Sequence, residues 1–236
     1  MIIPIGLDNG FDHRSTAWDL DHPGCFAYGP DGSSAVVAMG RAIPDYITWL
    51  ESHTPEPWFH PDAIDIRLET VWEDYTIDDN YNRASSGKWV LAFFQNEWKP
   101  LTPEEAEHGL LLYRWARADL LDTVSGLTST ELDAPPRPGE AKTLRGILAH
   151  VAIINWWLLD RLDLSELRRD QLPKDIFERL EVLSTCTQQA IPHLAGVDKV
   201  IGREGEFWSP RKLLRRLVWH ERDHTGHILK ILTGAA

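Results

Sequence analysis

The stretch LLRRLVWHERDHTGHI, residues 213–228, decides how the rest of the chain is interpreted. At about 100° per residue of an α-helix, most of its leucines and its final isoleucine fall on one apolar stripe. His220, His224 and His227 lie on or beside that stripe, which in a packed helix faces the protein core. Burying an imidazole without a partner costs on the order of 1–3 kcal/mol. Three imidazoles in one stripe therefore point to a site rather than to ordinary packing.

The spacing of His220 and His224 is that of a chelating pair. Residues four apart lie one helical turn apart with converging side chains, as two ligands of a divalent ion must. A third ligand has to come from another helix, and TLRGILAHVA, residues 143–152, places His150 beside the apolar stripe of an earlier helix. We therefore predict a metal site made by His150, His220 and His224. The alternative is three ordinary core histidines.

The same residues also satisfy H-E-x-x-H, the zinc-metalloprotease motif, in which Glu221 would be the general base. Those enzymes usually take a third ligand further downstream, but here His227 stands at i+3 and Lys230 occupies the i+6 position. A protease is therefore disfavoured. Glu221 remains the candidate catalytic residue, with a salt bridge on the helix flank as the alternative. His227 is expected to line a pocket or support the ligands rather than bind the ion.

Residues 103–236 are expected to form an all-α four-helix bundle. Thr102-Pro103-Glu104-Glu105 is a strong helix start, with a capping threonine, a proline in the first turn and acids near the positive end of the helix dipole. Four helical stretches of about 20 residues are separated by breakers rich in proline or glycine. They are expected at residues 103–126, 140–163, 173–195 and 209–233.

Residues 1–80 predict a small β-β-β-α-β unit. Three short β-prone pieces lie between turn-forming runs, at residues 2–7, 15–20 and 25–28. A helix follows, with a serine at 33 or 34 as its N-cap and Pro44 expected to kink or break it. Residues 64–71 alternate apolar and charged residues, which is typical of a half-buried strand with Ile64, Ile66 and Leu68 on its buried face.

The predicted fold class is therefore α+β with two domains, residues 1–80 and 103–236, joined by a packed connecting segment at 81–102. The charge distribution supports separate units, since residues 1–80 hold 15 acidic and 3 basic side chains while residues 81–236 hold 21 of each. So acidic a first unit argues against nucleic-acid binding. The histidines of this first unit have no helical spacing and are expected at the surface: His13, His22, His53 and His60.

Composition excludes several other classes of protein. The chain is 43% hydrophobic and 25% charged, which argues against disorder. Cys25 and Cys186 are too few for a disulfide framework. The N-terminal residues do not read as a signal peptide, and no run approaches the ~18–20 apolar residues that span a bilayer. We expect a cytoplasmic protein.

Two resemblances add to this interpretation. DHPGCFAYG, residues 21–29, followed by a helix and a strand, resembles the HicB-like antitoxin fold over about residues 1–75. This resemblance implies a fold and a protein-binding or dimerising role, and no catalytic residue. Residues 143–152 together with 209–228 resemble the DinB-like metal-binding bundle superfamily. The second resemblance implies that His150, His220 and His224 are the ligands.

Members of the DinB-like superfamily include S-transferases and isomerases that use a low-molecular-weight thiol, such as bacillithiol or mycothiol, with zinc or nickel. By that resemblance, a metal-bound thiol cosubstrate would attack a small electrophile. Where that family often has Arg-Gly-Gln after the last ligand, this chain has Thr225-Gly226-His227. The candidates for the wall of the thiol or substrate pocket are His227 and four tryptophans, Trp115, Trp156, Trp157 and Trp219.

Two other functions stay open at this point. The chain could be a metal-stabilised interaction module without catalysis, or a metal-dependent hydrolase that activates water instead of a thiol. We expect a homodimer, for which the apolar segment from Trp89 to Trp98 is a plausible contact surface.

Overall fold

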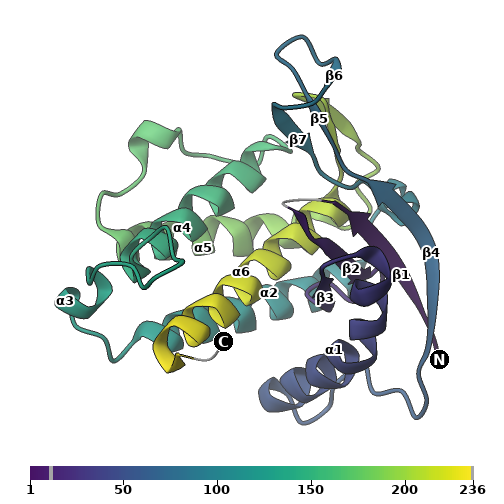
Figure 1. Ribbon diagram of the computed structural model, residues 1–236, viewed down its shortest axis with the longest axis horizontal. Coiled ribbons are helices and arrows are strands. Elements are labelled where there is room, and N and C mark those ends of the chain that lie inside the picture. The colour runs from purple at the N-terminus through teal and green to yellow at the C-terminus, as the bar shows by residue number, and fades with distance from the viewer. Residues whose placement is uncertain (11–12, 235–236) are drawn as a thin grey trace. The chain divides into compact units, whose positions relative to one another are not determined.

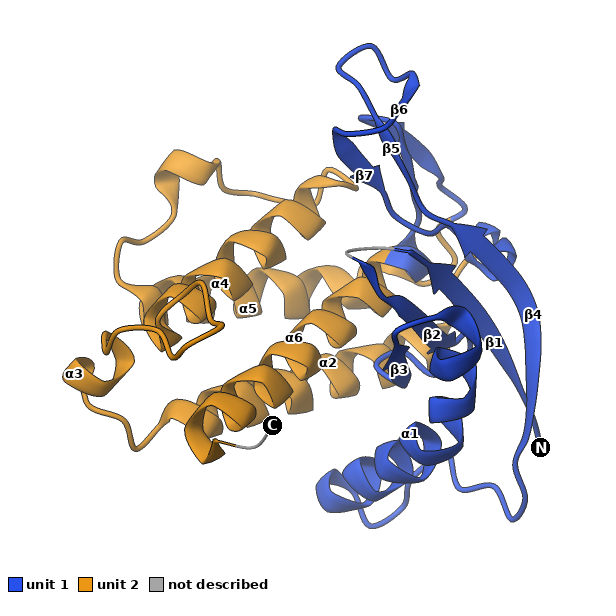
Figure 2. Cartoon of the chain, viewed as in Figure 1, with its two compact units in different colours: residues 1–99, 198–212 blue, residues 100–197, 213–236 orange. Residues whose placement is uncertain are grey.

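The computed structural model describes residues 1–10 and 13–234 (Figure 1). The chain forms two compact units, residues 1–99 with 198–212 and residues 100–197 with 213–236 (Figure 2). The units run differently from the predicted domain ranges, because residues 81–99 and 198–212 both belong to the first unit. Within the described part of the chain, no helix is long and apolar enough to cross a membrane.

The first unit is built on a four-stranded sheet of order β3-β2-β1-β4. β1 (Ile2–Asn9), β2 (Ser15–Asp19) and β3 (Phe26–Gly29) are antiparallel neighbours, whereas β4 (Asp65–Glu73) runs parallel to β1. Because β4 runs parallel to its neighbour β1, the chain has to cross over the sheet before it enters β4. α1 (Gly32–His53), which connects β3 to β4, makes this crossover. The predicted order β-β-β-α-β is confirmed. α1 buries one stripe of residues, Ala35, Met39, Ile43, Tyr46 and Leu50.

The predicted serine N-cap of α1 was wrong, and of the kink or break predicted at Pro44 the structure excludes the break. Its N-cap is Asp31, whose side chain accepts a hydrogen bond from the backbone N–H of Ser34, so the serines lie in the first turn. Pro44 does not break the helix, which runs on to His53. Ile43 and Tyr46 on either side of the proline are buried, and their packing offsets the backbone hydrogen bond that proline cannot donate.

The strand predicted at residues 64–71 is present as β4, but the buried apolar face predicted for it was wrong. Ile64 is 38% exposed and Leu68 is 46% exposed, while Ile66 is half-buried. β4 is an edge strand, and α1 packs mainly on β1, β2 and β3. An alternating pattern reports two unlike faces of a strand, but it does not report whether anything covers the apolar face.

His22 departs from the surface position expected for it. Its Nδ1 lies 2.8 Å from Oδ2 of Asp19, and its ring stacks on Phe59 with 3.7 Å between centroids. The side chain is only 17% exposed. The residue therefore stabilises the turn after β2.

Two small sheets complete the first unit, and sequence analysis missed both. β5 (Tyr75–Ile77), β6 (Arg83–Ala84) and β7 (Lys88–Val90) form one sheet of order β6-β5-β7. β8 (Ile201–Arg203) and β9 (Glu206–Trp208) form a hairpin where a break between helices was expected. A short 3₁₀ turn, η2 (Gln95–Trp98), follows β7. Strands of two or three residues are too short to show a period.

A buried lysine holds the hairpin to the segment after β7. Nζ of Lys212 donates hydrogen bonds to the carbonyl oxygens of Leu91, at 3.2 Å, and Phe207, at 3.0 Å. These contacts explain why residues 198–212 join the first unit.

The second unit is helical, and its four main helices confirm the prediction. They are α2 (Pro103–Val124), α4 (Leu144–Asp160), α5 (Ile176–Ala190) and α6 (Pro210–Thr233). Shorter turns lie between them, α3 (Ser129–Leu132), η3 (Arg169–Gln171) and η4 (Ile191–Leu194). Thr102 caps α2 in a capping box with Glu105, and the Thr143 hydroxyl caps α4 by accepting from Gly146 N–H.

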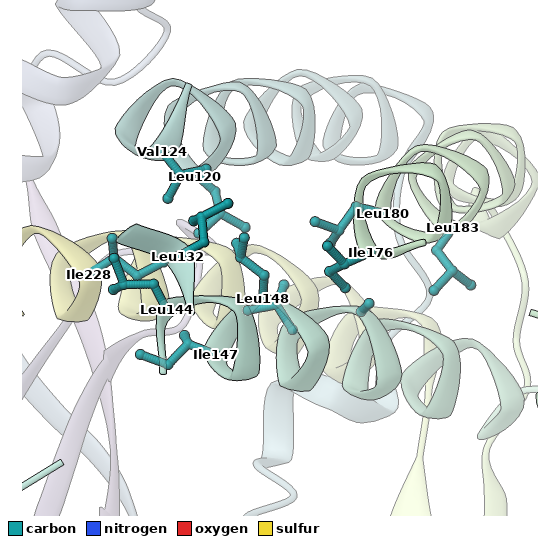
Figure 3. Packing of buried hydrophobic residues seen from close by; sticks show 12 residues of the cluster. Leu120, Val124, Leu132, Leu144, Ile147, Leu148, Ile176, Leu180, Leu183 and Ile228 are labelled. Carbon is teal, nitrogen blue, oxygen red and sulfur yellow. The ribbon is translucent and has the colours of Figure 1, made fainter. Parts of the chain in front are cut away.

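The core of the second unit is formed where these helices meet. Leucine and isoleucine side chains from α2, α3, α4, α5 and α6 point toward one another (Figure 3). Leu120, Leu148 and Leu180 have no exposed surface. This packing fixes how α4 and α6 lie against each other, and with them the histidines they carry.

Candidate metal centre

Two imidazoles lie one turn apart on the inner side of α6. His220 is 4% exposed and His224 is half-buried. Their ring centroids are 4.5 Å apart. The helical spacing therefore brings these two side chains together as the sequence predicts.

His150 on α4 completes the group. Its Nε2 lies 3.4 Å from Nε2 of His220, and its ring centroid is 5.0 Å from that of His224. One ligand nitrogen of each of the three residues lies within 4.8 Å of the others. We call His150, His220 and His224 the histidine cluster.

The geometry of the histidine cluster fits a divalent ion. At the usual Zn–N distance of about 2.0–2.1 Å, two ligand nitrogens of a tetrahedral site lie about 3.3 Å apart. The separation of the two Nε2 atoms is close to this value. Three imidazoles also suit nickel, iron or copper, so the donor set does not choose the metal.

The surroundings of the cluster favour neutral imidazoles. Burial lowers the pKa of His150, and the positive charge of Lys142 acts in the same direction. Burial is also the main reason that the pKa of His220 lies well below its usual value, with its neighbouring imidazoles and arginines adding to the effect. A neutral imidazole keeps the lone pair that binds a metal ion.

Glu221, the predicted catalytic residue, is engaged in a buried ion pair with Arg117. Its two carboxylate oxygens accept hydrogen bonds from Nε and Nη2 of Arg117 on α2, at 2.9 and 2.5 Å. Nη1 of the same arginine donates to the carbonyl oxygen of Leu180 on α5. Glu221 is 1% exposed and Arg117 is 4% exposed. This contact joins three helices and supports a structural role for Glu221.

A neutral polar network lies in the same bundle core. The Tyr113 hydroxyl on α2 donates to Oδ1 of Asn155 on α4 at 3.4 Å, and Nδ2 of Asn155 donates to Oγ1 of Thr187 on α5 at 3.2 Å. Burial raises the pKa of Tyr113, so its hydroxyl keeps its proton. These groups satisfy one another.

His227, predicted as a pocket residue, lies next to the cluster. Its ring centroid is 5.9 Å from that of His224. Its Nε2 lies 2.7 Å from Oε2 of Glu140, in the loop before α4. Glu140 therefore fixes the orientation of the His227 ring.

The four candidate tryptophans occupy different surroundings. Trp219 is 8% exposed, its ring lies 5.7 Å from that of His220, and the Arg216 guanidinium lies 4.2 Å over it. Trp115 and Trp157 are half-buried, and Arg161 lies over the ring of Trp157. Trp156 donates to the carbonyl oxygen of Leu167. Of these four residues, the structure brings Trp219 against a histidine of the cluster.

A pocket of about 190 Å³, open to solvent, lies where the loop before α4 meets the end of α6. None of the four tryptophans lines it. Its wall is mostly apolar, and its charged residues are Glu131, Arg137, Glu140 and Lys142.

Sequence reasoning missed Arg117, Glu140 and Lys142. A signal existed for Arg117, because a charged residue within the apolar stripe of a helix needs a buried partner. Glu140 and Lys142 lie in a loop, where no periodicity indicates which way a side chain points.

Comparisons with known proteins bear on the helical unit. Residues 112–228 match the family model of the DinB superfamily. No curated protein matches the chain. A solved structure, YfiT from Bacillus subtilis, described as "a probable metal-dependent hydrolase with an unusual four-helix bundle topology", is similar at 21% sequence identity with a TM-score of 0.45, over 58% of this chain and 93% of that chain. The chain therefore contains a DinB superfamily domain at residues 112–228.

Proposed function

We propose that this protein is a metal-dependent enzyme that acts on small molecules, with His150, His220 and His224 holding one divalent ion. The observation that carries the proposal is the convergence of three imidazoles from two helices, with no carboxylate in the group. A three-histidine site leaves coordination positions open, as catalytic sites do and closed structural sites do not.

The reaction that we propose is the transfer of a thiol to a small electrophile, or a thiol-dependent isomerisation. A divalent ion at this site would supply Lewis acidity that makes a thiol or water lose its proton near neutral pH. The chain's own contribution is to fix the geometry. The ion pair of Arg117 with Glu221 joins α2 to α6 and thereby holds the turn that carries His220.

His227 is the residue that we propose to move a proton. With Nε2–H donated to Glu140, the Nδ1 atom carries a lone pair and can accept a proton beside the cluster. Glu140 would stabilise the imidazolium that results. In this respect the chain differs from the family pattern Arg-Gly-Gln, which has no imidazole at this place.

The first experiment measures the metal content and thiol transfer of the purified full-length chain. We expect one zinc or nickel ion per chain and transfer of a generic thiol to monochlorobimane. We expect His220→Ala to lose both, whereas His193→Ala, an exposed histidine of the same unit, should retain both. A wild-type chain that binds no metal would overturn the proposal.

Two alternative functions are separated from this one by further measurements. A metal-stabilised interaction module would lose stability with a chelator but would show no transfer at all. For a metal-dependent hydrolase with Glu221 as general base, Glu221→Gln should abolish hydrolysis and leave thiol transfer largely intact. Unfolding measured in parallel corrects for the weakened pair with Arg117.

The role of residues 1–80 is a separate proposal. We propose that they form a HicB-like domain that binds a protein partner or a second copy of the chain in the cytoplasm. The acidic composition of these residues supports a protein partner over a nucleic acid. Light scattering of the full chain tests for the dimer.

A further inference from the structure

The pocket beside the loop before α4 has a mostly apolar wall. Seven of its lining residues are apolar: Leu127, Ala134, Pro135, Pro136, Leu144, Ile231 and Leu232. Consecutive prolines restrict the backbone of one side of this wall, which keeps the pocket formed without a ligand. Such a surface fits the apolar part of a small molecule.

The charged groups of the pocket are unequally engaged. Glu131 accepts hydrogen bonds from the backbone N–H and the hydroxyl of Thr128, and Glu140 contacts His227. Among the described residues, neither Arg137 nor Lys142 has a carboxylate partner, and Arg137 makes one long hydrogen bond to the carbonyl oxygen of Leu232. Two cations are therefore available to a ligand, while both acids already have partners.

Two lining residues connect the pocket to the histidine cluster. Glu140 contacts His227, whose ring is next to that of His224. Lys142 comes directly before Thr143, the N-cap of α4, which is the helix that carries His150. Glu140 and His227 therefore link a molecule seated in the pocket to the histidine cluster.

We propose that this pocket selects a small anionic substrate with an apolar portion, whose negative group contacts Lys142 and Arg137. The inference rests on the proposed function, because it names the substrate class of that same site. The apolar portion lies against the wall that includes Leu144 and Ile231. Neutral and cationic analogues of the same shape bind more weakly, since only an anion gains charge-assisted hydrogen bonds from both cations.

Calorimetry on the zinc-loaded full-length chain tests the charge preference with three matched probes: octanoate, octanol and octylammonium. We expect octanoate to bind ~10-fold more tightly than octanol, which corresponds to about 1.4 kcal/mol, and octylammonium to bind most weakly. Because both cations are exposed, the preference should shrink in high salt. Equal binding of octanoate and octanol, or tighter binding of octylammonium, overturns the proposal.

The variant Arg137→Gln/Lys142→Gln identifies the contacts. We expect it to lose the ~10-fold preference for octanoate while octanol binds as before. Lys174→Gln removes an exposed lysine that does not line the pocket and is the matched control. A preference that survives in the double variant contradicts the assignment to these residues.

Cobalt absorption distinguishes failure of this inference from failure of the proposed function. In the cobalt-loaded chain, octanoate should shift the visible bands of the ion and octanol should not. If no cobalt binds, the proposed function fails, and calorimetry on the metal-free chain still decides the charge preference of the pocket. If cobalt and octanoate both bind and the bands stay unchanged, the pocket does not deliver its ligand to the cluster and the inference is wrong.

Discussion

Two neighbouring residues of α6 show two different ways of burying a polar group. Glu221 faces Arg117, and donor, acceptor and charge are matched between them. His220, one position earlier, faces two more imidazoles, and none of the three carries an opposite charge that could pair with another. Both residues are almost fully buried.

A structural polar contact differs from a candidate site in whether its own groups satisfy one another. The pair of Arg117 with Glu221 and the network around Asn155 satisfy themselves within the bundle. The histidine cluster places two Nε2 atoms face to face, where a shared cation stabilises all three rings at once. Removing a residue from the ion pair or from the network should lower the free energy of unfolding. Removing a histidine of the cluster should lower the affinity for the metal ion.

The largest effect on stability is expected from Glu221→Ala. It leaves the Arg117 guanidinium buried without its carboxylate, which we expect to cost about 3–5 kcal/mol of unfolding free energy. Urea unfolding of the metal-free chain measures this loss. Replacing both partners, as Arg117→Met/Glu221→Leu, should restore most of the stability. If the double variant is as unstable as the single one, the matched pair is not what holds these helices together.

His220→Ala should act mainly through the metal. With zinc at 100 times its dissociation constant, the wild-type chain gains about 2.7 kcal/mol of stability, and the variant should lose this gain. The measurement is thermal unfolding with and without zinc, beside the exposed variant His193→Ala as a control. Equal stabilisation of wild type and His220→Ala by zinc would show that the ion binds elsewhere.

Asn155→Ala should have an intermediate effect. It removes one partner of the buried Tyr113 hydroxyl and one of the partners of Thr187, at a cost of about 2 kcal/mol. Zinc affinity should stay within about twofold of wild type, because Asn155 is not a member of the cluster. A large loss of zinc affinity would show that the network around Asn155 and the histidine cluster are energetically coupled.

Thr102→Ala should have the smallest effect, about 1 kcal/mol, because it removes the N-cap of α2. Urea unfolding should show this loss with no change in zinc binding. Thr102→Ser, which keeps the capping oxygen, should unfold close to wild type.

The helices and the cluster could be predicted because their signals are local. Thr102 and the residues that complete its cap lie within one helical turn, and His220 and His224 are four residues apart on one helix. The position of His150 followed from the apolar stripe of its own helix. Neither the exposure of β4 nor the partner of Glu221 could be found in this way, because each depends on which segments meet across the fold.

The central claim is that one ion is shared by residues of two helices, and the most direct measurement is anomalous diffraction at the zinc edge from crystals of the zinc-loaded chain. We expect a single peak within about 2.0–2.1 Å of one nitrogen each of His150, His220 and His224. In crystals of His150→Ala, this peak should be absent. A zinc peak bound only by residues of α6, or unchanged in His150→Ala, would contradict the account.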